Sequence, residues 1–428
     1  MDSFRSVSSQ LVLAFTSATN GGLAAELHRA VFTLKYFFLP SILFAVALAS
    51  CPKTPRYRWV CYLSFACYVS LCSNPTALAA YRTGHVWFDH SIGTTVGSCL
   101  LNALHVLVLV DPFKEYRHQS DDLRGGKPRE LPWLKRVYWA WSVLMSLRGV
   151  GWNYQMPHIP ERSEPPPTRT KFILNMLGNL IRCYLLVDLT QNLLRAAPFL
   201  HHHQRPQDFS LRSLPFHQRF FCIATWFTSG YAAISAQYYT VALVCVTCRF
   251  SEPGDWPPPF GSLASSYSVR NFWGKTWHSF IRRFCISPGN KLIQLLQIPS
   301  KSIPAGLIKL YTTFLISALL HSVGDYTISP EYYGLSFLFF ILQPVAITCE
   351  ELIKCLLHKY VEQERLERFY FAGKVIGYIW VGWWLTETAP FLLDPAMLVG
   401  FDRHRIFPHS PMSRLAAKFE LFRSTGVN

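Results

Sequence analysis

Apolar stretches of about twenty residues recur along the whole of this 428-residue chain. Half of its residues are hydrophobic and only 15% are charged, whereas a soluble globular domain has about 25% charged residues. A helix needs about 20 mostly apolar residues to cross the hydrocarbon core of a bilayer. The sequence therefore predicts an all-α fold, a polytopic transmembrane helical bundle with about eight spans.

The spans predicted from hydropathy cover roughly 31–50, 58–73, 93–111, 171–198, 219–248, 305–325, 332–352 and 370–387. No small-residue cleavage site follows the first span, which is therefore interpreted as a retained signal anchor. The chain is divided into an N-terminal segment, 1–30, a transmembrane domain, 31–390, and a C-terminal tail, 391–428.

The formal net charge of +16 comes mainly from Lys and Arg residues in the connections between apolar stretches. Basic residues gather in the cytoplasmic loops of membrane proteins, so the connections after the first, third, fifth and seventh spans are predicted to face the cytosol. The basic tail after Pro390 breaks this alternation, because an eighth span would place it on the opposite side. Because the charge follows the loops, nucleic acid is not expected as a partner.

The fourth span carries two polar stripes at spacings of three and four residues, formed by Asn175, Asn179 and Arg182 and by Asp188, Asn192 and Arg195. Such groups avoid lipid and face either a neighbouring helix or a polar cavity. Helix packing and a functional lining both remain open for them.

No metal site is predicted. The run His201–His203 has poor geometry for one tetrahedral site, because its three imidazoles are consecutive and no carboxylate accompanies them. Cys245 and Cys248 have the spacing of half a zinc site, but no second pair follows.

His321 is an ionisable side chain at the end of the apolar run Phe314–Leu320. A desolvated imidazole is biased toward its neutral form, which a general base acting on a hydroxyl requires. Asp325 follows four residues later, and on a continuous helix its carboxylate would share a face with His321 and hold the ring tautomer. Two interpretations are open: a catalytic pair, or a structural histidine on a helix that ends at Gly324.

The connection before this span concentrates polar and aromatic groups in the stretch Arg270–His278. Asn271 and His278 would polarise a thioester carbonyl or stabilise its oxyanion. The cations available to bind the phosphates of coenzyme A are Arg270, Lys275, Arg282 and Arg283. The alternative is an interfacial belt of aromatic residues with cytosolic positive charges.

Three sequence blocks stand out in order along the chain: Ser146–Asn153, then Trp256–Gly261 leading into Asn271–His278, and finally Leu319–Asp325. In these blocks the chain resembles the wax synthase branch of the membrane-bound O-acyltransferases, especially fungal members found in terpenoid and meroterpenoid pathways. The likeness extends over most of the chain by hydropathy and is sharp only in the blocks.

The resemblance implies a helical bundle with a tunnel that meets a buried histidine, His321, acting as the catalytic base with Asp325 behind it. Asn271 and His278 would be catalytic donors of the family's second motif. In relatives outside the fungal branch an Asn often stands where His278 stands, so Asn271 is the alternative donor. Acyl-CoA would contact Arg270, Trp273, Lys275, Trp277 and Arg282.

On the same resemblance, we expect no bound cofactor and no metal, with acetyl-CoA as co-substrate and a lipophilic hydroxylated small molecule as acceptor. The expected activity is acetyl transfer to a terpenoid or meroterpenoid hydroxyl by a multi-pass protein of the endoplasmic reticulum. The second enzymatic interpretation is a wax or sterol ester synthase that uses long-chain acyl-CoA. A membrane transporter is the alternative of another class, supported by the polar stripes but lacking an inverted repeat.

Overall fold

The computed structural model describes residues 39–50, 55–72, 86–119, 127–159, 167–200, 209–398, 406 and 409–415. These residues are mainly helical and contain no β-strand, only one isolated antiparallel bridge between His118 and Trp152. The segment 1–30, the start of the first predicted span and the run His201–His203 lie outside them.

Four of the described helical stretches are long and apolar enough to cross a membrane: Val86–Leu109, Arg169–Ala196, Ile303–Ile328 and Pro330–Tyr360. The prediction of an all-helical membrane protein is therefore confirmed. The described residues provide four such spans, whereas the sequence predicted about eight over the whole chain.

The residues form two compact units. The first comprises the residues up to Glu115, Gly126–Met145 and Val323–Tyr333. Its helices are α3 (Leu39–Ser50), α4 (Pro55–Cys72), α6 (Val86–Leu104), α7 (Pro112–Glu115) and α9 (Trp133–Met145).

In the first unit α6 continues as a π-helical turn, His105–Leu109. Arg58 of α4 donates hydrogen bonds to the carbonyl oxygens of Leu107, at 2.6 Å, and Val106, at 3.3 Å. The last carbonyl groups of a helix have no N–H partner within the helix itself. The Arg58 guanidinium therefore supplies hydrogen bonds to carbonyl groups at the end of this π-helical turn.

The second unit comprises Tyr116–Gly125, Ser146–Ser322 and the chain from Gly334 onward. Its long helices are α10 (Arg169–Ala196), α11 (Phe216–Thr247), α13 (Arg282–Leu295), α14 (Ile303–Ile328, up to Ser322), α15 (Phe337–Tyr360) and α17 (Tyr370–Thr388). Its short helices are α12 (Val269–Asn271), α16 (Gln363–Arg368) and α18 (Pro390–Leu398).

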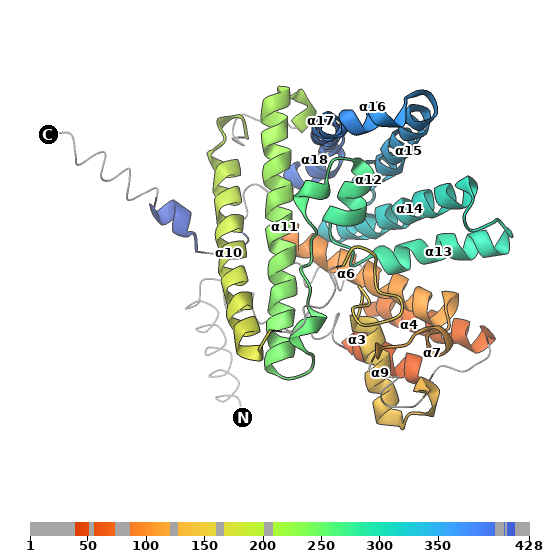
Figure 1. Ribbon diagram of the computed structural model, residues 1–428. Helices are drawn as coiled ribbons and strands as arrows, with labels where there is room; N and C mark the ends of the chain where they lie inside the picture. The colour runs from red at the N-terminus through yellow and green to blue at the C-terminus, as the bar shows by residue number, and fades with distance from the viewer. Residues whose placement is uncertain are drawn as a thin grey trace, which may run out of the picture. The chain divides into compact units, whose positions relative to one another are not determined.

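Helices α10 and α11 form a hairpin and lie side by side (Figure 1). Small side chains of α11 are buried, among them Ser229, Ala232, Ala233 and Ser235. Small residues allow two helix backbones to approach closely, and the burial of these side chains indicates such close packing of α11.

The C-terminal segment binds one of the polar stripes of α10. The backbone N–H of Met412 donates to Asp188 Oδ2 at 2.9 Å. Asn192 donates to Ser410 Oγ at 3.0 Å and accepts from Ser413 Oγ at 2.7 Å. These contacts support the packing interpretation of Asp188 and Asn192 over a functional lining.

Candidate functional site

The third sequence block lies on α14, which continues as a helix through Gly324 and Asp325 to Ile328. The alternative in which Gly324 ends the helix is therefore wrong. A Cβ at Gly324 would lie 2.6 Å from His90 Nε2, so the glycine is explained by close helix packing.

His321 is half-buried and its imidazole stacks on the ring of Phe340 in α15. The ring centroids are 4.2 Å apart and the planes differ by 7°. A ring held flat against a neighbouring aromatic side chain has few orientations open to it. The stack therefore fixes the direction of the His321 nitrogens relative to α15.

Asp325 lies one turn beyond His321 on α14 and is buried. Its Oδ1 is 3.7 Å from Nε2 of His90, a side chain of α6. The continuous helix meets the condition under which Asp325 and His321 share a face. The orienting role of Asp325 remains a prediction, and His90 is a neighbour that the sequence did not indicate.

The second block folds as the short helix α12 followed by a π-helical turn, Phe272–Thr276. Ser268 Oγ accepts the N–H of Asn271 at 3.1 Å, which starts α12, and the N–H of Trp277 closes the wide turn on Phe272 O at 2.7 Å. π-Helical turns are rare and occur frequently at functional sites.

The Trp256–Gly261 block runs against this turn and is tied to its backbone. Gly261 donates its N–H to Thr276 O at 2.9 Å. A Cβ at Gly261 would lie 2.0 Å from Lys275 O, a separation that no side chain tolerates. Gly261 therefore allows the Trp256–Gly261 and Asn271–His278 parts of the second block to touch.

Trp273, a predicted acyl-CoA contact, packs edge-on between two helices. Its ring centroid lies 6.2 Å from that of Phe314 on α14 and 6.0 Å from that of Phe339 on α15. Phe314 lies two turns before His321 on α14, and Phe339 is the neighbour of Phe340, the residue of α15 that stacks on His321. The second block therefore packs against the two helices that carry His321 and its stacking partner.

Trp277, the other predicted aromatic contact, belongs to the same cluster. Its centroid lies 5.3 Å from Phe227 of α11, 5.2 Å from Phe260 and 5.7 Å from Phe272. These rings join the turn to α11 and to the Trp256–Gly261 block.

His278 stacks on Phe280 at 5.3 Å and meets Phe260 edge-on at 5.8 Å. Burial, and secondarily the positive charge of Arg148, lowers the pKa of His278 from 6.5 to about 4. The imidazole is therefore neutral at physiological pH, with one N–H donor and one acceptor. A neutral donor at this position is compatible with the predicted role of His278 in stabilising an oxyanion.

Arg148 of the first block is a residue whose contacts the sequence reasoning missed. Its side chain is buried, and it donates to Pro257 O at 2.9 Å and to Pro258 O at 2.8 Å. The hydroxyl of Tyr238 on α11 also donates to Pro257 O, at 2.8 Å. An arginine directly before a glycine in the first block was the available signal, and the structure shows that it joins the first block to the second.

The predicted phosphate-binding cations differ in their surroundings. Arg270 pairs with Glu351 of α15 at 2.8 Å, and both side chains are nearly half exposed. Arg282 donates to Gly274 O at 2.9 Å, across the π-helical turn. Lys275 is half-buried on that turn. Arg270 and Arg282 therefore help to hold the block, and their binding of coenzyme A remains a prediction.

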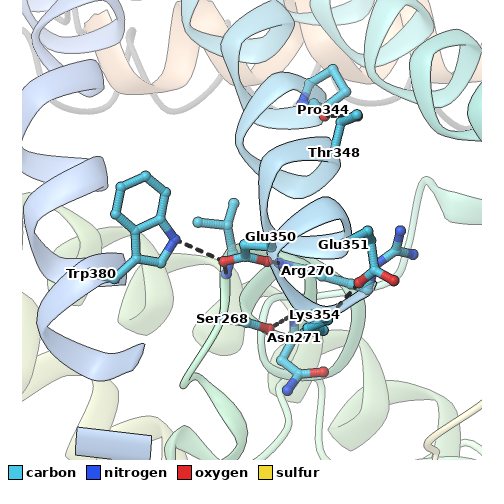
Figure 2. A network of polar contacts seen from close by, with 10 residues as sticks. Ser268, Arg270, Asn271, Pro344, Thr348, Glu350, Glu351, Lys354 and Trp380 are labelled. Atoms are coloured by element: carbon cyan, nitrogen blue, oxygen red, sulfur yellow. Dashed lines mark hydrogen bonds and ion pairs between the residues drawn. The ribbon is translucent and has the colours of Figure 1, made fainter. Parts of the chain in front are cut away.

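Asn271, the alternative donor, lies half-buried where α12 meets the π-helical turn. Its amide is directed away from Glu350 of α15 (Figure 2).

The sequence region that contains this geometry matches a known family model. Residues 256–342 match the model described as membrane bound O-acyl transferase family. The predicted resemblance to the membrane-bound O-acyltransferases is confirmed, and the placement in the wax synthase branch stays a prediction. The chain is an acyltransferase that is similar to the membrane-bound O-acyltransferases over these residues. The α10–α11 hairpin, residues 168–247, matches a second model, the C-terminal domain of aspirochlorine biosynthesis protein F.

Curated relatives of this acyltransferase-type chain are fungal proteins. Acetyltransferase ple2 of Rhodocybe pseudopiperita is 29% identical over 82% of this chain and 89% of its own length. Acetyltransferase eriL of Hericium erinaceus is 27% identical over 66% and 72%, and O-Mevalon transferase macI of Penicillium terrestre is 27% identical over 61% and 63%. No solved structure matches the chain.

Proposed function

We propose that this enzyme transfers an acetyl group from acetyl-CoA to a hydroxyl of a terpenoid or meroterpenoid intermediate, in the membrane of the endoplasmic reticulum. The observation that carries the proposal is the family match over residues 256–342, which includes both the Asn271–His278 block and His321. The contacts of Trp273 and His321 with α14 and α15 support it. Relatives named acetyltransferases support the acetyl donor.

The proposed reaction is a direct transfer. His321 accepts the proton of the acceptor hydroxyl while the oxygen forms a bond to the acetyl carbonyl carbon. Donors of the second block, with His278 or Asn271 as candidates, stabilise the oxyanion. The C–S bond then breaks, and the proton on His321 passes to the leaving thiolate of coenzyme A. No acyl-enzyme is required.

The test uses membranes that contain the wild type or His321→Ala, incubated with labelled acetyl-CoA, palmitoyl-CoA and a panel of hydroxylated terpenoids, with products identified by mass spectrometry. A positioned base contributes about 10²- to 10⁴-fold, so acetyl transfer should nearly vanish in the variant. His358→Ala is the matched control, because His358 is exposed near the end of α15.

Retained activity in His321→Ala would reject the base assignment. Transfer of palmitate alone would identify a long-chain ester synthase. Two relatives are named O-Mevalon transferases, so preference for an acyl group other than acetyl would revise the donor and keep the reaction class. No transfer from any donor would reject the enzymatic proposal in favour of transport.

A further inference from the structure

Helix α15 presents two buried polar side chains on one face. Gln343 is fully buried and Glu350 is 7% exposed, and the two are seven positions, or two turns, apart. Both lie in the candidate span Pro330–Tyr360. An ionisable side chain within a span is costly and by default indicates a function. Neither residue belongs to the three sequence blocks.

The Glu350 carboxylate accepts three hydrogen bonds, all drawn from the surroundings of the second block or from α17. Oε1 accepts the N–H of Val269 at 2.6 Å and the indole N–H of Trp380 at 2.8 Å. Oε2 accepts the N–H of Arg270 at 3.1 Å. Figure 2 shows the carboxylate between Trp380 and the start of α12. Both oxygens of the buried carboxylate therefore have N–H partners.

Gln343 holds the block at a second point. Its Oε1 accepts the indole N–H groups of Trp273 and Trp384, both at 3.2 Å, while its Nε2 donates to Phe339 O at 2.8 Å. The neighbouring Phe340 carries the stack with His321. Helix α15 therefore contacts Val269 and Arg270, which lead into the Asn271–His278 block. It also contacts Trp273 of the block and His321.

The neighbouring carboxylate, Glu351, differs from Glu350 in each respect. It is 44% exposed and pairs with Arg270 and Lys354, and exposed pairs contribute little to stability. Among the described residues Glu350 pairs with no cation and bonds to backbone and indole N–H groups instead. Its bonds therefore fix the course of the chain rather than neutralise a surface charge.

We propose that Glu350 is a positioning residue for acyl transfer: its carboxylate fixes Val269 and Arg270, which lead into the Asn271–His278 block, against α15, whose Phe340 stacks on His321. This inference rests on the proposed function, because it assigns Glu350 to the alignment of the oxyanion donors with the base. Misplacing catalytic groups by about 1 Å can cost about 10²-fold in rate. Glu350 itself touches neither substrate nor reacting atoms.

The experiment compares Glu350→Gln and Glu350→Asp with Glu364→Gln, which changes an exposed carboxylate on α16. Glutamine keeps the volume but presents an NH₂ group to an N–H donor. In Glu350→Gln we expect kcat for acetyl transfer to fall about 10- to 100-fold. The KM for acetyl-CoA and the amount of folded protein should stay near the wild-type values. Glu350→Asp keeps a carboxyl group that accepts N–H donors and should recover part of the lost kcat, and Glu364→Gln should behave as the wild type.

Wild-type kcat in Glu350→Gln, or a loss confined to KM, would overturn the inference. If that variant does not fold, Trp380→Phe removes one of the three donors and should lower kcat about three- to tenfold. Unchanged kcat in folded Trp380→Phe would then count against positioning. A wild-type protein that transfers no acyl group refutes the proposed function itself, whereas an active wild type with an equally active Glu350→Gln refutes only the role of Glu350.

Discussion

Replacing Arg148 by Met should disturb the site without touching the proposed catalytic side chains. The substitution removes the hydrogen bonds to Pro257 O and Pro258 O, at 2.9 and 2.8 Å. Tyr238 still donates to Pro257 O, so only Pro258 O loses its described partner. A hydrogen bond to a charged group contributes about 1.5–3 kcal/mol. The two bonds together give an expected loss on the order of 3 kcal/mol, which corresponds to about 100-fold in rate if all of it serves alignment.

The assay is acetyl-transfer kinetics in membranes together with thermal unfolding in detergent. Arg148→Lys retains the charge but cannot reproduce the fork of the guanidinium, so it should recover only part of the activity. Arg365→Met, at a 70% exposed side chain paired with Glu362, is the control and should be neutral. Wild-type kinetics and unfolding temperature in Arg148→Met would refute the view that this residue joins the first and second blocks.

Two further predictions concern the same block. Gly261→Ala should reduce activity at least tenfold and lower the unfolding temperature, because its Cβ would meet Lys275 O at 2.0 Å. Gly274→Ala is the control and should be tolerated, because no atom lies within 4 Å of its Cβ. Equal effects of the two substitutions would contradict the packing argument. Because burial lowers the pKa of His278 from 6.5 to about 4, its contribution to stability is fully present above pH 6.5 and is lost as the pH falls toward 4, by up to about 1.4 kcal/mol per pH unit. His278→Asn should flatten this slope in unfolding measured from pH 4 to 7, and an unchanged slope would reject the burial of the neutral ring.

The helical architecture could be predicted because hydropathy alone decides whether a segment can cross a bilayer. The fourth and sixth predicted spans, 171–198 and 305–325, correspond to α10 and α14 within a few residues. The third begins seven residues earlier than predicted, at Val86, where Asp89 and His90 interrupt the apolar pattern. Polar residues that pack inside the protein obscure such boundaries.

The candidate site was only partly predictable. His321 and the Asn271–His278 block carry unusual residue types, so the sequence exposes them directly. The π-helical turn depends on contacts between residues distant in sequence, such as that of Gly261 with Thr276, and local propensity does not encode it. Gln343 and Glu350 are two polar residues seven positions apart in an apolar run, which places them on one face of a helix. The helical spacing that revealed the polar stripes of the fourth span would have revealed this pair as well.

The anchoring of the C-terminal segment gives one stripe of α10 its polar partners. Tyr184, Asp188 and Asn192 bind the segment at positions four residues apart, so three successive turns of the helix, about 12 Å along its axis, face it. All three side chains lie in the candidate span Arg169–Ala196, where a polar group without a partner is costly. The segment therefore stabilises α10 as a membrane helix from a position more than 200 residues away in sequence.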